Sequence, residues 1–173
     1  VLNKVDKGEL ALNQKLFIKK NELLENTWSP FKKKYPNGDI SISLKEALEW
    51  MITVSDNNIC DILIRLVGGV EAVGHFINNS NFVIKNDEEG MHKNWDAQFL
   101  NTTTPNFSSQ LLKSFFEGRQ LTKKSTKFLY KTMLSTSVGK NRIKGKLPPK
   151  TKVAHRTGSS FTNKEGVTGA IND

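Results

Sequence analysis

The stretch Ser43–Gly69, SLKEALEWMITVSDNNICDILIRLVGG, carries the clearest structural signal of the chain. It opens with a capping box, a serine followed three residues later by Glu46, which is typical of a helix start. Apolar residues then recur at helical spacing, at Ala47, Leu48, Met51 and Ile52. A second helix is predicted from Asp56 to Val67. Gly68-Gly69 ends it, because glycine readily adopts the conformation needed at a helix C-terminus.

Further helices are predicted on the C-terminal side of this stretch. A short helix is expected over residues 70–77, and helices resume near Pro105 and again near Thr122. Residues 79–104 show no clear period and are rich in Asn, Asp, Glu, Gly and Thr. A loop of this length inside a compact domain usually has a function.

The pattern changes after Pro148-Pro149. Residues Thr151–Phe161 alternate like a strand, a loop follows, and a second strand is predicted to begin at Val167. The order is helices first and strands afterwards. We therefore predict a mainly helical domain over residues 1–150 and, over residues 151–173, the start of a sheet that remains incomplete.

The composition, with 36% hydrophobic and 25% charged residues, is typical of a soluble globular protein. The length of 173 residues suits one domain, or one and a half if the protein extends further. No apolar run reaches 18 residues, so no membrane span is predicted. Cys60 is the only cysteine, which excludes an internal disulfide, and an unreactive thiol is expected there. The net charge is +9. Much of the excess lies in residues 140–156, but this run lacks interleaved aromatic residues. We therefore expect a basic face that attracts small anions, and no nucleic-acid partner.

Three groups of residues indicate chemistry. Ser55-Asp56-Asn57 lies at the junction of the two predicted helices, where side chains can point into a cleft, although Ser55 or Asp56 could simply cap the second helix. Arg156-Thr157-Gly158-Ser159 suits a carboxylate ligand: arginine pairs with it, threonine donates to it, and glycine allows close approach. An exposed strand end is the alternative. Glu88, in the long loop, could act as a general base or be merely solvated.

Taken together and in this order, these groups resemble the motif set of class A serine β-lactamases, which includes S-D-N and K-T-G. Further segments are similar to this family over essentially the whole chain, and its Bacteroidota branch, with extended-spectrum enzymes, is the most similar. These segments are Trp28-Ser29-Pro30, Leu66-Val67-Gly68-Gly69, Thr103-Thr104-Pro105 and Leu147-Pro148-Pro149. The resemblance implies the α+β β-lactamase–transpeptidase fold, with an omega loop at about 86–105. It also implies hydrolysis of penicillins and cephalosporins through a serine acyl-enzyme, and hence antibiotic resistance.

The resemblance also implies roles for individual residues. Glu88 corresponds to the glutamate that activates the deacylating water, and Ser55 to the hydroxyl that passes a proton to the lactam nitrogen. Asn57 corresponds to the amide that holds the substrate's side-chain carbonyl. Arg156, Thr157 and Ser159 would bind the substrate carboxylate, with the Ser159 N–H as half of the oxyanion hole. The remaining residues predicted for substrate binding are Trp28, His92, Arg142 and Gly158.

Several positions depart from the usual family pattern. Arg156 replaces a lysine, His92 and Asp61 stand where many members have asparagine, and Arg142 occupies the place of an arginine that supports carboxylate binding in some members. No S-x-x-K motif occurs in the 173 residues. We expect the nucleophilic serine and its lysine to lie shortly before Val1, and this stretch alone to be inactive.

Two alternatives remain open from the sequence. A penicillin-binding protein or D,D-peptidase shares the serine chemistry but generally lacks a deacylating glutamate, and a non-enzymatic relative would lack the nucleophile. The family reading further implies β-lactam antibiotics as the small-molecule partners, no cofactor or metal, a monomeric full-length protein and a periplasmic location.

Overall fold

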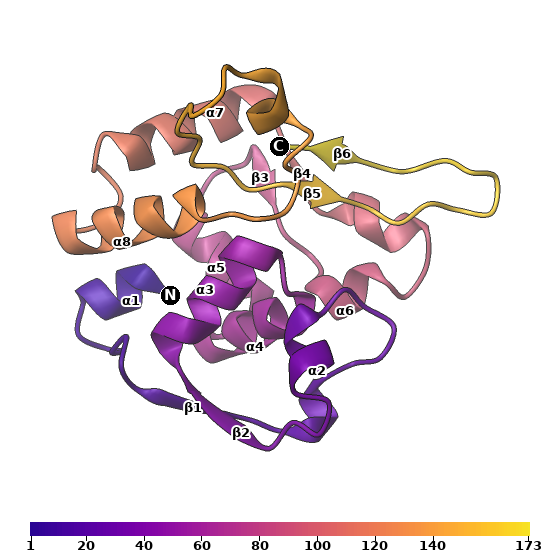
Figure 1. The fold of residues 1–173 in the computed structure, drawn as a ribbon, viewed down its shortest axis with the longest axis horizontal. Helices are drawn as coiled ribbons and strands as arrows, with labels where there is room; N and C mark the ends of the chain where they lie inside the picture. Colours follow the sequence, from indigo (N-terminus) through magenta and orange to yellow (C-terminus); the bar gives the residue numbers. More distant parts are fainter.

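The computed structural model describes all 173 residues, as α-helices with three two-stranded antiparallel sheets (Figure 1). The first half contains, in chain order, α1 (Leu2–Asp6), β1 (Lys15–Ile18), η1 (Lys20–Glu22), α2 (Pro30–Lys34), β2 (Ile40–Ser43), α3 (Leu44–Val54), α4 (Asn57–Val67) and α5 (Gly69–Ile77). The second half contains β3 (Phe82–Val83), α6 (Glu88–Met91), η2 (Asp96–Leu100), β4 (Thr102–Thr103), α7 (Pro105–Phe116), α8 (Lys123–Leu134), η3 (Ile143–Lys146), β5 (Gly158–Ser159) and β6 (Ile171–Asn172).

The two central helices begin and end where the sequence predicts. The Ser43 hydroxyl accepts a hydrogen bond from the Glu46 N–H at 3.1 Å and caps α3. Asp56 caps α4 by accepting from the Ile59 N–H at 3.0 Å, and Gly68 ends α4 with a φ of 109°. These boundaries are local, because each capping group lies within a few residues of the backbone group that it satisfies.

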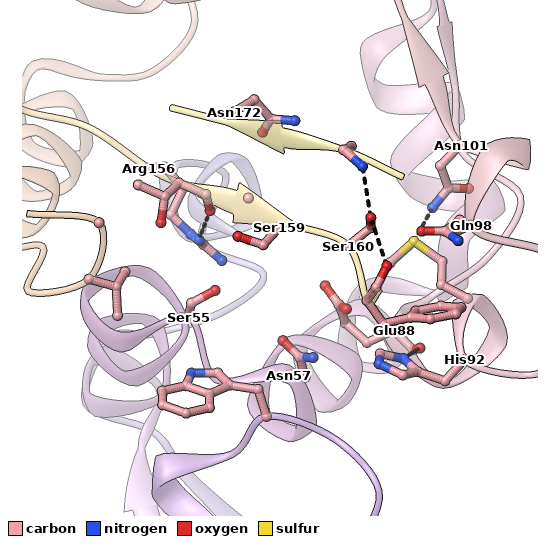
Figure 2. Close-up of a pocket in the computed structure, with 18 of the residues that line it drawn as sticks. Ser55, Asn57, Glu88, His92, Gln98, Asn101, Arg156, Ser159, Ser160 and Asn172 are labelled. Atoms are coloured by element: carbon pink, nitrogen blue, oxygen red, sulfur yellow. Dashed lines mark hydrogen bonds between the residues drawn. The ribbon is translucent and has the colours of Figure 1, made fainter. Parts of the chain in front are cut away.

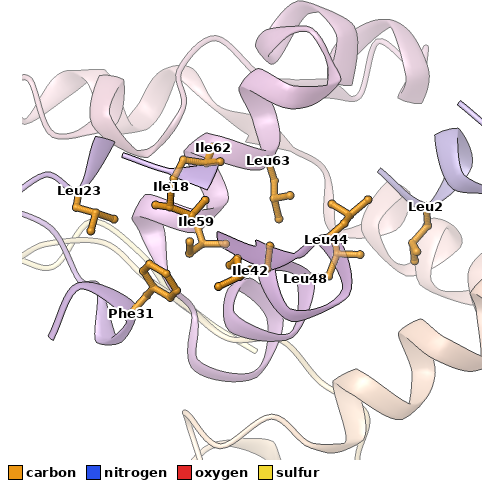
Figure 3. Close-up of a cluster of buried hydrophobic side chains, with 11 residues drawn as sticks. Leu2, Ile18, Leu23, Phe31, Ile42, Leu44, Leu48, Ile59, Ile62 and Leu63 are labelled. Carbon is orange, nitrogen blue, oxygen red and sulfur yellow. The ribbon is translucent and has the colours of Figure 1, made fainter. Parts of the chain in front are cut away.

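The main hydrophobic core lies between α3, α4 and the two-stranded β1–β2 sheet (Figure 3). Its fully buried side chains include Ile18, Phe31, Leu44, Ile59 and Leu63. Burial of side chains of this size stabilises the fold by about 1.5–3 kcal/mol each. The core therefore holds the α3–α4 junction, where Ser55 lies, in a fixed position.

The β1–β2 sheet corrects the prediction that helices precede all strands. Lys15 pairs with Ser43 and Ile18 with Ile40 in an antiparallel register, so this sheet comes before α3. Its two strands are only four residues long, and more than twenty residues separate them in the chain. Local alternation is too brief at this length to predict such a pairing.

The predicted strand over residues 151–161 is also wrong for most of its length. Only Gly158 and Ser159 are in a strand, β5, which pairs with Asn172 and Ile171 of β6. The second strand begins at Ile171 rather than at Val167, and Thr162 and Thr168 form an isolated bridge between the two arms. In this antiparallel register residues 151–156 lie opposite positions beyond Asp173, and the pairing observed covers Gly158 and Ser159.

Residues 79–104 contain short elements rather than a continuous irregular loop. β3 and β4 pair with each other and close this segment at its base, with Phe82 opposite Thr103. α6 and η2 lie inside it. The Asn101 side chain links the two ends of this segment, because its Oδ1 accepts from the backbone N–H of Lys85 at 2.8 Å and of Asn86 at 3.0 Å.

None of the helices combines the length and the apolar character that a membrane span requires.

Candidate active site

One cavity of about 730 Å³ collects all ten residues predicted for the site. They are Trp28, Ser55, Asn57, Glu88, His92, Arg142, Arg156, Thr157, Gly158 and Ser159. In Figure 2 the side chains of Ser55, Asn57 and Glu88 converge on the strand that carries Ser159. Ser55 and Thr157 thus lie on one cleft, and the proposed role of each residue remains a prediction.

Ser55 occupies the turn between α3 and α4 in a left-handed conformation, with φ 62° and ψ 45°. This conformation is rare for a residue other than glycine, and such residues cluster at functional sites. No hydrogen bond within the chain uses the Ser55 hydroxyl, which borders the cavity. The hydroxyl is therefore free to interact with a ligand.

Asp56 is turned away from the cavity and holds the junction together. Its carboxylate is fully buried and accepts from the Ser29 hydroxyl at 2.9 Å, the Phe31 N–H at 2.7 Å and the Ile59 N–H at 3.0 Å. Burial raises the pKa of the Asp56 carboxyl, while these hydrogen bonds act in the opposite direction. The aspartate of the motif is therefore structural, and it leaves Ser55 and Asn57 to face the cavity.

Asn57 and Trp28 form one wall of the cavity. The Asn57 amide donates to the Thr27 hydroxyl at 2.9 Å, and its backbone N–H donates to the Trp28 carbonyl at 3.0 Å. The Trp28 indole donates to the Val54 carbonyl at 2.9 Å while half of the residue remains exposed. The ring is thus held at the mouth of the cavity and presents an apolar surface to a ligand.

Glu88 begins α6 and reaches the cavity from the side opposite Ser55. Its position depends on Asp61 of α4, whose carboxylate oxygens accept from the backbone N–H groups of Glu88 at 2.8 Å and Glu89 at 2.9 Å. Burial, strengthened by the negative charge of Asp61, raises the pKa of the Glu88 carboxyl. A carboxyl with a raised pKa in a cleft is typical of a general base or acid.

Asp61 is the clearest functional candidate that the sequence analysis did not select. It is 3% exposed, and burial raises the pKa of its carboxyl to about 6 against the hydrogen bonds from Glu88 and Glu89. The sequence analysis noted Asp61 only as a residue that stands where many family members have asparagine. Its contact with Glu88 spans 27 positions, so only the fold could reveal it.

His92 lies at the end of α6 and links the loop to the C-terminal hairpin. Its Nδ1 lies 2.7 Å from the carbonyl oxygen of Glu88, and its ring stacks on Phe161 with centroids 5.8 Å apart. Trp95 packs edge-on against the same phenylalanine at 5.3 Å. His92 and Phe161 line the cavity, and Trp95 supports Phe161 without lining it.

The basic side of the cavity is formed by Arg156, Thr157, Ser159 and Arg142. The Arg142 guanidinium donates to the Gly158 carbonyl at 2.8 Å and also to the Ser159 hydroxyl. Arg156 donates to the Thr157 carbonyl; burial lowers the pKa of its guanidinium, and the nearby Glu88 acts in the opposite direction. Two cations and two hydroxyls at one end of a cavity suit a carboxylate ligand.

Cys60 does not join this chemistry. Burial, together with the charges of Glu88 and Asp61, raises the pKa of its thiol to about 12, which agrees with the predicted unreactive thiol. No group of three or more His, Cys, Asp or Glu side chains lies close enough to hold a metal ion.

Comparison with known proteins places the chain in a class of enzymes. The profile described as "Beta-lactamase enzyme family" matches residues 1–168. The chain therefore belongs to the β-lactamase family, with the α+β fold of class A.

Individual relatives narrow this assignment. The chain is 42% identical to β-lactamase VEB-1 of Pseudomonas aeruginosa over all of this chain and 59% of the relative. It is 40% identical to a β-lactamase of Bacteroides uniformis, covering all of this chain and 60% of that protein. The match to the crystal structure of the TLA-3 extended-spectrum β-lactamase covers 99% of this chain and 63% of the TLA-3 chain, with a TM-score of 0.96 and 49% identity. The chain thus spans about three fifths of the length of these relatives.

Proposed function

We propose that the full-length protein hydrolyses the amide bond of β-lactam antibiotics through a serine acyl-enzyme and so confers resistance. One observation carries the proposal: Glu88, the unpartnered hydroxyl of Ser55 and the basic group around Arg156 face a single cavity. In this proposal these groups serve as a base, a proton donor and a carboxylate site around one space, which is the arrangement that acyl transfer and hydrolysis need. The family membership supports the same chemistry.

Substrate binding follows from the charges of the cavity. The substrate carboxylate pairs with Arg156 and accepts from the hydroxyls of Thr157 and Ser159. Arg142 supports this binding indirectly, because its hydrogen bonds to the Gly158 carbonyl and the Ser159 hydroxyl hold these residues in place. The amide of Asn57, held in place by its hydrogen bond to Thr27, donates to the carbonyl oxygen of the substrate's side chain. Trp28 covers the opening.

Acylation requires a nucleophile that none of these residues supplies. In this proposal the serine and lysine of an S-x-x-K motif come from the two fifths of the relatives' length that this chain does not match. As that serine attacks the lactam carbonyl, its proton passes through the lysine and the Ser55 hydroxyl to the lactam nitrogen, whose C–N bond breaks. The backbone N–H of Ser159 donates to the carbonyl oxygen as it gains negative charge, and loss of one such donor costs roughly 3–4 kcal/mol in comparable enzymes.

Deacylation is assigned to Glu88. Its carboxylate removes a proton from a water molecule as the water attacks the ester carbonyl of the acyl-enzyme; the bond to the serine oxygen breaks, and that oxygen takes up the proton. Asp61 assists deacylation indirectly. Its carboxylate fixes the backbone of Glu88, and its charge raises the pKa of Glu88 and makes the glutamate a stronger base. The 86–105 loop serves as the family's omega loop in this proposal, and we also propose the periplasmic location expected of the family.

The test compares Glu88→Gln with Glu89→Gln in the full-length protein. Both changes remove one carboxylate from α6, but only Glu88 lines the cavity, and Glu89 is exposed. Glu88→Gln should still acylate with a good substrate and then stall. Mass spectrometry should show a persistent adduct, while steady-state turnover falls by several orders of magnitude. Glu89→Gln should turn over like the parent protein.

The outcomes separate the three candidate functions. Turnover unchanged by Glu88→Gln would remove this residue from the mechanism. A parent protein that forms a stable penicillin adduct without turnover would be a penicillin-binding protein or D,D-peptidase. A parent protein that forms no adduct at all would be a non-enzymatic relative.

A further inference from the structure

A buried histidine–aspartate pair lies behind the basic side of the cavity. Nδ1 of His155 is 2.7 Å from Oδ1 of Asp173, and each of the two side chains is only 4% exposed. An ionised carboxylate can only accept, so the imidazole donates its Nδ1–H to it. Nε2 of His155 is buried and has no hydrogen-bond partner. Asp173 therefore provides the only hydrogen bond that orients the ring, and neither residue lines the cavity.

The second oxygen of Asp173 holds another segment of the chain. Its Oδ2 accepts from the backbone N–H of Ile143 at 3.1 Å, where η3 begins. One carboxylate thus joins two positions that are each next to an arginine of the cavity. Arg142 directly precedes Ile143, and Arg156 directly follows His155.

The pair is also connected to the helical part of the molecule. The buried Thr136 hydroxyl donates to the His155 carbonyl at 2.8 Å. The next residue, Ser137, donates its backbone N–H to the Thr53 carbonyl at 2.8 Å, near the end of α3. Thr53 lies two residues before Ser55. A series of hydrogen bonds therefore connects the pair to the turn that carries Ser55.

The pair does not depend on what the rest of the protein covers. Residues outside the 173 can only bury it further, because the described residues already bury both side chains almost completely. A donor that they brought to Nε2 of His155 would leave the contact between Nδ1 and Asp173 in place. The backbone around the pair also follows that of the longer TLA-3 chain, with a TM-score of 0.96.

We propose that Asp173 and His155 are positioning residues for the substrate carboxylate. Asp173 acts on Arg156 through His155, and it acts on Arg142 through the backbone of Ile143. This inference rests on the proposed function, in which Arg156 binds the carboxylate and Arg142 supports that binding. The carboxylate is bound in the ground state and in the transition state alike. Loss of the pair should therefore raise KM and leave kcat nearly unchanged.

The test compares two substrates of the full-length protein: benzylpenicillin, which has a free carboxylate, and its methyl ester, which has none. Asp173→Asn keeps the shape of the side chain but replaces one acceptor oxygen with an NH₂ group, which accepts from neither donor. Loss of one hydrogen bond of ordinary strength corresponds to about tenfold in affinity. The KM for benzylpenicillin should rise by about this factor, and the KM for the ester should not change.

Two substitutions of His155 separate positioning from folding. Asparagine carries an N–H donor at the place of Nδ1 but leaves a cavity, whereas leucine has no donor. His155→Asn should lower the melting temperature and preserve the KM for benzylpenicillin, and His155→Leu should raise this KM about tenfold. If the pair only stabilised the fold, KM would follow the melting temperature instead. These two variants decide the question if Asp173→Asn does not fold.

The matched control is Asp6→Asn. The Asp6 carboxylate also joins two distant segments, because it accepts from the backbone N–H of Thr122 at 2.8 Å and from the Ser125 hydroxyl at 2.5 Å. It does not border the cavity. Asp6→Asn should therefore lower the melting temperature and leave the KM of both substrates unchanged.

Failure of the inference and failure of the proposed function give different results. If the parent protein hydrolyses benzylpenicillin and Asp173→Asn leaves KM unchanged, or raises it equally for the ester, the inference alone is overturned. A parent protein without turnover contradicts the proposed function, and calorimetric Kd values for the two compounds then replace KM. A tenfold loss of affinity in Asp173→Asn that is confined to the free carboxylate would still support the inference. Equal affinities in the parent and the variant, or no binding at all, would overturn both.

Discussion

Gly139 is the position at which one added methyl group should most directly disturb the candidate site. It lines the cavity with a φ of +66°, and a Cβ built there would overlap the Thr157 methyl carbon and lie 3.2 Å from the Thr157 Cβ. Gly139→Ala therefore imposes two costs. The backbone must hold alanine in a left-handed conformation, and Thr157, which is 8% exposed, must move.

The two costs can be estimated separately. A left-handed conformation costs an L-residue roughly 1–2 kcal/mol, and overpacking in a buried place costs about 1–3 kcal/mol. Gly8 isolates the first cost, because its φ is +77° and no atom lies within 4 Å of its Cβ position. We expect Gly8→Ala to lower the free energy of unfolding by about 1–2 kcal/mol and Gly139→Ala by about 2–5 kcal/mol.

Chemical denaturation of the two variants measures this difference, and steady-state kinetics measures its effect on the site. Displacement of Thr157 should raise the KM for a β-lactam in Gly139→Ala and leave it unchanged in Gly8→Ala. Equal destabilisation by the two substitutions would refute the reasoning, because it would show that Thr157 yields without cost.

Two further predictions concern buried carboxylates. The pKa of Asp61 is raised to about 6, so between pH 4 and pH 6 the folded state holds this proton more tightly than the unfolded chain, and the free energy of unfolding should fall with rising pH by up to about 3 kcal/mol. Asp61→Asn has no such proton, and denaturation curves across this range should lose that slope; an unaltered slope would assign it to other groups. Asp56→Ala deprives the N–H groups of Phe31 and Ile59 of their acceptor, and we expect a loss of about 2–4 kcal/mol. A loss below about 1 kcal/mol in urea unfolding would mean that water replaces the carboxylate.

The sequence by itself determined the elements whose signals are local. The Ser43 cap, the Asp56 cap and the Gly68 stop each act within a few residues, so α3 and α4 were predictable from the order of residues alone. The ten site residues were selected through the order of three motifs and their likeness to one family. The geometry then showed that all ten border one cavity.

Only the tertiary structure decided the features that depend on distant partners. Alternation suggested a strand over residues 151–161, and the structure shows which residue lies opposite which, Gly158 opposite Asn172 and Ser159 opposite Ile171. The β1–β2 sheet exists because Lys15–Ile18 pairs with Ile40–Ser43, a segment far along the chain. Asp61 gains its place behind Glu88 in the same way, across 27 residues. Backbone pairing and burial are properties of the neighbours that folding brings together, and a local pattern of residues does not contain them.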